Sequence, residues 1–204
     1  MIRCLPDAVR QDDRVLVIGA GLGVVSSLVA SDGAARVIAV EANTALIPYL
    51  KRVHTLNGVP WVETVNGVLG AGRTGRVPFF VQRDIRASSL LPVDQSWETA
   101  LVVPMMDLNL ILEEERISLI ICDIPAASVQ LLAPAELGSV QRILVNCAGN
   151  SVHDENENDP WSPLTTQGFV AEPYGTSILF DRSGATRQNL SRRGDSGFNT
   201  SKSA

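Results

Sequence analysis

Four short runs of apolar residues constrain the fold of this chain more than any other feature of its sequence. They are RVLVI at Arg14–Ile18, RVIAV at Arg36–Val40, SLIIC at Ser118–Cys122 and QRILVN at Gln141–Asn146. Such runs are apolar on both faces, which is typical of strands buried between two layers of helices. Segments of helical spacing separate them, so the sequence predicts an α/β fold with a mostly parallel sheet.

Two helices and three further strands complete this predicted sheet. Leu22–Ala30 and Thr44–Asn57 carry apolar residues at helical spacing, and Trp61–Val65 predicts a strand. Gly168–Glu172 and Thr176–Asp181 predict an antiparallel pair joined by a turn. The expected fold class is a Rossmann-like α/β domain whose mostly parallel, seven-stranded sheet ends in a C-terminal antiparallel hairpin.

The middle of the chain has a less regular pattern. Val77–Val81 predicts an extra strand or one arm of a hairpin, and Asp84–Trp97 predicts a loop. Ala100–Pro104 predicts a short strand, which is followed by a helix around Asp107–Glu115.

Length and composition predict one domain and a tail. Of the 204 residues, 45% are hydrophobic and 19% are charged, so the chain can bury a core without disulfides or metals. Residues 183–204 are Ser, Gly, Asn and Arg with almost no apolar side chain, and we expect a disordered tail there. Residues 1–182 are expected to form the domain.

Charge and cysteine content exclude several classes of partner. The formal net charge of −5 argues against nucleic-acid or anionic-membrane partners, because both need a basic surface. Cys4, Cys122 and Cys147 form no CxxC pair, and only two histidines are present, so we expect no metal site. The chain lacks an apolar run of 18 residues and a signal-like N-terminus, and the cytoplasm is the predicted location.

One glycine-rich segment carries most of the chemical information. VIGAGLGVVSS, at Val17–Ser27, places Gly19, Gly21 and Gly23 between a buried strand and a helix. Glycines there permit a tight turn and the close approach of a ligand to the backbone. The start of the helix then presents free N–H groups to a polar ligand group. The alternative is a glycine-rich turn that binds nothing.

An acidic residue at the end of the next strand adds to this pattern. Glu41 lies 22 residues after Gly19, where a carboxylate can accept hydrogen bonds from ribose hydroxyls. The alternative for Glu41 is an exposed acid at a strand end. The glycines and Glu41 together predict an adenosine-type cofactor at the carboxyl edge of the sheet. The dinucleotide pattern G-x-G-x-x-G fails at Val24, whereas G-x-G-x-G is commoner in S-adenosylmethionine (SAM) methyltransferases.

The order of these motifs resembles the FkbM-type class I methyltransferases. The resemblance runs through VIGAGLGVVSSLVA, RVIAVEANTALIPYLKRVHTLNGV, NGVL, ASSL, VPMMDLNLIL and LIICDIPAAS, and it covers residues 14–182. Many methyltransferases share the first block, whereas the Asp107 segment followed by the Asp123 segment points to this family. The resemblance implies the class I methyltransferase fold, SAM as the cofactor, and a small-molecule or sugar hydroxyl as the methyl acceptor.

The resemblance also assigns roles to residues at the carboxyl edge. The glycine turn would line the methionine part of SAM, Glu41 would hold the ribose, and Ala42 would pack beside the adenine. The residues expected to bind the cofactor are Gly19, Ala20, Gly21, Gly23, Glu41, Ala42, Asn66 and Gly67. An alternative role for Asn66 is to form the turn before Gly67.

Asp123 is the candidate catalytic residue, because it ends a strand next to the expected methyl donor. A carboxylate there can accept or orient the substrate proton. It can equally hold the SAM amino group or cap the following helix.

This chain departs from the family pattern in its catalytic half. The family typically reads D-x-E-G-x-E where this chain has Asp123–Ser128, and both glutamates are missing. The family often has Glu in place of Asn146, and many class I enzymes have an acid near Val17. A non-catalytic protein that keeps the fold as a scaffold or partner subunit is therefore the second hypothesis. A nicotinamide oxidoreductase is the third, and a homo-oligomer is possible.

The histidines and an acidic segment have other expected roles. His54 lies on a helix face beside Leu50 and is expected to be a partly buried surface histidine. His153 is a possible general base near Asp154–Asp159, which predicts a solvated acidic loop.

Overall fold

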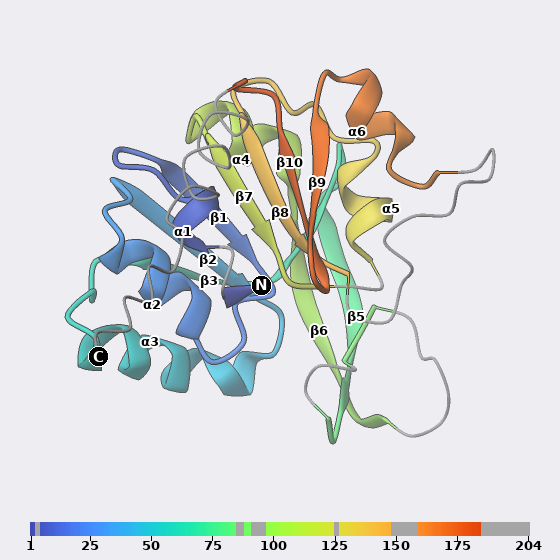
Figure 1. The fold of residues 1–204 in the computed structure, drawn as a ribbon. Coiled ribbons are helices and arrows are strands. Elements are labelled where there is room, and N and C mark those ends of the chain that lie inside the picture. The colour runs from blue at the N-terminus through green and yellow to red at the C-terminus, as the bar shows by residue number, and fades with distance from the viewer. Residues whose placement is uncertain (3–4, 85–87, 91–96, 125–126, 148–158, 185–204) are drawn as a thin grey trace, which may run out of the picture.

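The computed structural model describes residues 1–2, 5–84, 88–90, 97–124, 127–147 and 159–184 (Figure 1). The described helices and strands are α1 (Leu5–Ala8), β1 (Arg14–Ile18), α2 (Val24–Ser31), β2 (Arg36–Glu41), η2 (Thr44–Leu46), α3 (Ile47–Leu56), β3 (Glu63–Asn66), β4 (Val68–Gly70), β5 (Gly75–Gln82), β6 (Trp97–Asp107), α4 (Leu108–Glu114), β7 (Leu119–Cys122), α5 (Ser128–Leu132), β8 (Arg142–Asn146), α6 (Ser162–Thr166), β9 (Val170–Tyr174) and β10 (Ser177–Asp181).

The main sheet has seven strands in the order β3-β2-β1-β7-β8-β10-β9. Every pair from β3 to β8 is parallel, and only β10 runs against both of its neighbours. This order confirms the Rossmann-like fold of the class I methyltransferases that we expected, with its antiparallel C-terminal hairpin. The strand order reverses between β1 and β7, and in open α/β sheets ligands bind at the carboxyl edge of such a switch point.

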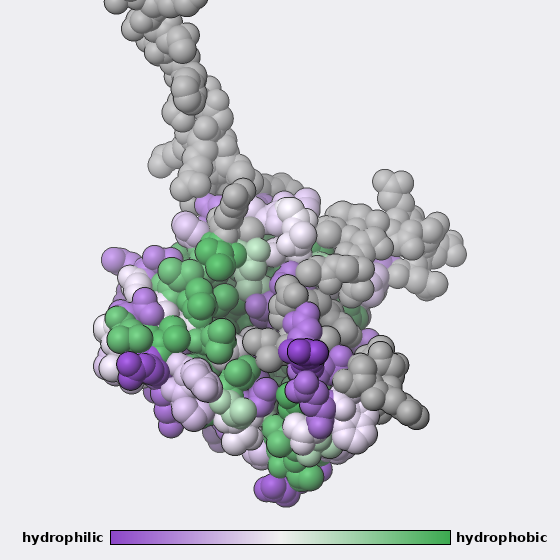
Figure 2. Space-filling model, turned by 90° about the horizontal axis from the view of Figure 1, so that it is seen from below, coloured by the Kyte–Doolittle hydropathy of each residue, from purple (hydrophilic) through white to green (hydrophobic). Residues whose placement is uncertain are grey.

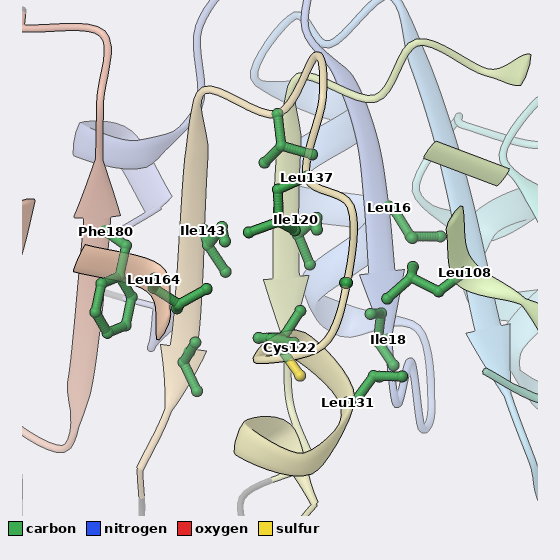
Figure 3. Packing of buried hydrophobic residues seen from close by; sticks show 14 of the residues in the cluster. Leu16, Ile18, Leu108, Ile120, Cys122, Leu131, Leu137, Ile143, Leu164 and Phe180 are labelled. Carbon is green, nitrogen blue, oxygen red and sulfur yellow. The ribbon is translucent and has the colours of Figure 1, made fainter. Parts of the chain in front are cut away.

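Apolar side chains cover both faces of this sheet because every second residue of a strand points to the same side. Leu16, Ile18 and Ile120 pack with residues of α4, α5 and α6 on one face, which Figure 3 shows from close by. Val15 and Val17 pack with residues of α1, α2 and α3 on the other. Each fully buried aliphatic side chain stabilises the fold by about 1.5–3 kcal/mol, so the two layers hold β1 firmly at the centre.

The middle segment forms an antiparallel arm at one side of the main sheet. β5 pairs with β6 from Gly75–Met105 to Gln82–Trp97, and β4 adds a short parallel strand to β6 (Figure 1). The predicted hairpin arm is therefore confirmed, but β6 extends well beyond the short strand expected at Ala100–Pro104. β6 is longer than expected because it pairs with β5 along its length. The apolar pattern of neither strand alone indicates this pairing. Of the predicted loop, residues 85–87 and 91–96 lie outside the described residues.

Buried polar groups join the amino ends of the central strands. Arg142 Nη2 lies 2.6 Å from Asp13 Oδ1, and both side chains are almost fully buried. Ser118 Oγ donates to the same carboxylate oxygen at 2.7 Å. Arg142 Nη1 donates to the Ala8 carbonyl at 2.5 Å. Both terminal nitrogens of Arg142 are thus paired, whereas its buried Nε has no hydrogen-bond partner among the described residues, and the ion pair links the amino ends of the strands.

His54 is a fully buried histidine, which corrects the expectation of a partly buried surface position. It is 2% exposed, and its Nε2 lies 2.8 Å from the hydroxyl of Ser26 on α2. The Ser26 hydroxyl in turn donates to the Gly23 carbonyl at 3.1 Å. The surface expectation was wrong because it considered α3 alone, whereas α2 packs over this part of the helix. His54 thus joins α3 to the glycine turn.

Protonation of His54 is expected to destabilise the fold. Burial lowers the pKa of His54 below its ordinary value, so the unfolded chain takes up this proton at a higher pH than the folded protein does. The free energy of unfolding therefore falls as the pH drops below about 6.5, until the lower folded pKa is passed. Urea unfolding across this interval measures the slope.

The matched comparison is His54→Asn against His153→Asn. The first variant should lose this part of the pH slope, whereas the second should retain it. An identical slope in the wild type and His54→Asn would contradict the prediction.

Candidate functional site

The parallel register of β1 brings three predicted residues to one edge. Ile18 is level with Val40 of β2 and with Cys122 of β7, so Gly19, Glu41 and Asp123 each follow directly. Backbone hydrogen bonds continue beyond the strands. Gly19 N donates to the Val40 carbonyl at 3.0 Å, and Asp123 N donates to the Ile18 carbonyl at 2.9 Å. The residues expected at the cofactor and catalytic positions therefore meet at the switch point.

The three glycines of the turn have three different environments, although all have positive φ. A Cβ on Gly19 would lie 2.7 Å from Ile124 Cγ2 and 2.9 Å from the Asp123 carbonyl oxygen. A Cβ on Gly23 would meet Leu50 and His54 at 3.2–3.3 Å. Gly21 has nothing within 4 Å. Gly19 and Gly23 thus serve close packing, and Gly21 is the glycine that a ligand can approach.

Glu41 connects the end of β2 to the glycine turn. It is 7% exposed, and its two carboxylate oxygens accept from different backbone amides. Gly21 N donates to Oε2 and Asn43 N donates to Oε1, each at 2.7 Å. A carboxylate offers about four lone-pair positions, so two positions remain for the hydroxyls of a ribose. Glu41 is buried rather than the exposed strand-end acid of the alternative interpretation.

The side-chain amide of Asn66 forms hydrogen bonds with neighbouring residues of the same chain. Its amide nitrogen donates to the carbonyls of Glu41 and Ala42 at 2.9 and 3.1 Å, and its Oδ1 accepts from the Thr44 hydroxyl at 2.9 Å. This arrangement holds the ends of β2 and β3 together. Both amide hydrogens of Asn66 already have acceptors within the chain. A contact between Asn66 and an adenine ring stays a prediction.

Ala42 and Gly67 connect the edge of the sheet to the arm. Ala42 is buried in a small cluster with Phe79 and Val103 of the arm. Gly67 N donates to the Glu41 carbonyl at 2.9 Å, and a Cβ on Gly67 would lie 2.7 Å from the Pro104 carbonyl oxygen. Gly67 therefore allows β6 to approach closely, and its contact with a cofactor stays a prediction, as does that of Ala42.

Asp123 borders a cavity of about 500 Å³ on the β8 side of the switch point. Its Oδ1 accepts from Asn146 Nδ2 at 2.8 Å. The residues that line the cavity are Met1, Ile2, Val25, Asp123, Asn146, Tyr174, Gly175 and Thr176. From the sequence, Asn146 was expected only as a departure from the family pattern. A signal for the pair was present, since Asp123 and Asn146 follow or end consecutive predicted strands, and consecutive strands of an α/β sheet are often adjacent.

The neighbouring cysteine is chemically inert. Burial raises the pKa of Cys122 to about 12, so the thiol stays protonated and is a poor nucleophile at neutral pH. Cys122 packs in the core between β1 and β8 (Figure 3).

Metal ligands and membrane spans were sought in the described part of the chain. Within it, no three His, Cys, Asp or Glu side chains lie together as a metal site would require. No helix of that part is long and apolar enough to cross a membrane. His153 and most of Asp154–Asp159 lie outside the described residues.

Comparison with protein-family models finds no match, and a search of curated proteins finds none. Among solved structures, the ribosomal protein L11 methylase from Lactobacillus delbrueckii subsp. bulgaricus has 12% identity and a TM-score of 0.46, covering 88% of this chain and 73% of that one. Precorrin-6y C5,15-methyltransferase from Geobacter metallireducens GS-15 has 15% identity and a TM-score of 0.46, covering 88% and 83%.

An RNA methyltransferase from Salinibacter ruber in complex with S-adenosyl-L-homocysteine (SAH) has 14% identity and a TM-score of 0.46, covering 88% of this chain and 86% of that one. These similar structures are methyltransferases with different acceptors in their names. At such identities and scores the likeness assigns neither a cofactor nor a reaction to this chain.

Alanine at Gly19 and at Gly21 should have different effects on stability. Gly19→Ala is expected to lower the free energy of unfolding by about 2–5 kcal/mol, because a strained left-handed backbone and a clash with Asp123 and Ile124, which follow β7, add together. Gly21→Ala meets no atom and should lose only about 1–2 kcal/mol from the backbone strain. Urea unfolding of both variants measures the difference. Equal losses would contradict the packing role of Gly19.

Proposed function

We propose that this protein is a SAM-dependent methyltransferase of the FkbM type. The observation that carries the proposal is the position of Glu41, a buried carboxylate with lone pairs to spare, directly beside the open face of Gly21. Both lie at the switch point of a sheet with the class I strand order. A ribose hydroxyl pair fits this carboxylate, and a backbone without side chains leaves room for the rest of the ligand.

The charge of the site favours SAM over a dinucleotide. Glu41 and Asp123 place two carboxylates at this edge, and the glycine turn and the strand ends beside it contain no Lys or Arg. A pyrophosphate would add negative charge next to them, whereas SAM carries a positive sulfonium and no phosphate. The failed G-x-G-x-x-G pattern at Val24 agrees with this choice. Tight binding of NADH would favour the oxidoreductase instead.

Different residues of the chain would bind the cofactor and assist the transfer of its methyl group. Gly19, Ala20, Gly21 and Gly23 would hold the methionine part with backbone groups, and Glu41 would hold the ribose. SAM supplies a methyl group that is already activated for transfer. The protein then needs to align a nucleophile and to remove its proton, and Asp123 is the group placed for the second task. The acceptor, a small-molecule or sugar hydroxyl, rests on the family resemblance.

A scaffold or partner subunit is the second candidate function. The missing glutamates after Asp123 favour it, because they remove carboxylates that the family typically has there. It predicts cofactor binding without turnover of any acceptor. The proposed location in the cytoplasm rests on the cysteine content and applies to either function.

SAM and SAH should both bind in the micromolar range by isothermal titration calorimetry. Glu41→Gln is expected to weaken SAH binding by roughly 10–150-fold, because one carboxylate oxygen becomes an NH2 group that accepts neither a ribose hydroxyl nor the backbone amide of Gly21 or Asn43. Glu63→Gln is the control, since Glu63 lies on the adjacent strand and pairs with Arg36 at the surface. Failure of the wild type to bind either ligand below about millimolar concentration would overturn the proposed function.

A further inference from the structure

The cavity beside Asp123 has an apolar wall and a polar wall. The side chains of Met1, Ile2 and Val25 form the first, and Asp123 and Asn146 belong to the second, while Met1 also brings the α-amino group of the chain to the cavity. The apolar wall reaches the outside, because Ile2 is a large exposed side chain, and Leu22 and Val24 at the start of α2 are large exposed side chains as well. Figure 2 shows hydrophobic surface gathered on the side of the molecule that carries α2 and α3. A ligand of this cavity should therefore be amphipathic.

Asp123 lines this cavity without an ion-pair partner at contact distance among the described residues. Its hydrogen bond from Asn146 comes from a neutral amide, and Asp123 takes part in none of the ion pairs of the described residues. A cationic group in the cavity would supply the missing charge, and an anionic group would be repelled.

Few basic side chains lie in the part of the chain that carries Asp123. The 66 residues from Ile117 to Arg182 contain eight Asp or Glu and only two Arg, which are Arg142 and Arg182. Arg142 opens β8 at the amino end of the sheet, and Arg182 follows β10 at the same end. The segments that follow β7 and β8, residues 124–127 and 147–160, contain neither Lys nor Arg.

The cavity is separate from the part of the edge proposed for the cofactor. None of Gly19, Gly21 and Glu41 lines it. The hydrogen bond from Asn146 draws the Asp123 carboxylate toward β8, on the opposite side of β7 from the glycine turn. Asn146 thus orients Asp123 toward β8, and the cavity lies beside the position proposed for the cofactor rather than at it.

We propose that this cavity binds a small amphipathic amine, whose ammonium group pairs with Asp123 while its apolar body lies against Ile2 and Val25. If the protein is the methyltransferase proposed above, this amine is the methyl acceptor or carries the hydroxyl that accepts the methyl group. Amine binding itself needs no cofactor, so it can be tested independently of methyl transfer.

Three probes with the same aromatic body test the proposal: 2-phenylethylamine, 2-phenylethanol and 3-phenylpropionate. Their dissociation constants are measured on the full chain by ligand titration in amide NMR spectra, which also locate binding through shifts at Val25, Gly175 and Thr176. The amine is expected to bind about 10-fold or more tightly than the carboxylate, because one gains and the other loses a charge interaction. Equal binding of the carboxylate, or shifts elsewhere only, would overturn the proposal.

Asp123→Asn should remove the preference of the amine over the alcohol, whereas Glu136→Gln, the same change at an exposed carboxylate, should keep it. SAH is titrated against the same proteins. Competition between SAH and the amine, or loss of SAH affinity in Asp123→Asn, would assign Asp123 to the amino group of the cofactor and overturn the proposal. If SAH fails to bind the wild type while the amine binds, the cavity stands and the proposed function falls.

Discussion

The parallel pairing of β1 with both β2 and β7 is the constraint on which the rest of the structure depends. It places Ile18, Val40 and Cys122 level, so that the residues after them, Gly19, Glu41 and Asp123, lie at one edge. The lack of a side chain at Gly19 then lets β7 and its following residues approach the turn closely. A shift of either pairing by one residue would turn every strand side chain to the opposite face and would separate these groups.

The carboxylates at the two edges of the sheet differ in whether they have a cationic partner. At the amino edge, the carboxylate of Asp13 is neutralised by Arg142 and shielded in the core. At the carboxyl edge, Glu41 and Asp123 have only neutral donors as partners. Compensated charge holds the strands together, whereas uncompensated charge leaves capacity for a ligand. The chain thus keeps its stabilising ion pair away from its candidate site.

Much of the fold could be predicted from the sequence, because buried parallel strands are continuous apolar runs with a turn or an acid after them. The length of β6 could not, since it depends on pairing with β5. The burial of His54 could not be predicted either, because it depends on the packing of α2. The same holds for the hydrogen bonds of Asn66, because their acceptors are carbonyls at the end of the neighbouring strand. The sequence predicted that Gly19, Glu41 and Asp123 come together at one edge, whereas the partners of each side chain follow from tertiary packing.

The hydrogen bonds of Glu41 have a consequence for the way any ligand would bind. Because this carboxylate already holds the amides of Gly21 and Asn43, the turn has its shape before a ligand arrives. The loss of conformational entropy in the turn then occurs during folding and does not oppose association. The protein therefore presents a preorganised receptor, with an affinity that depends on new contacts rather than on the ordering of a loop.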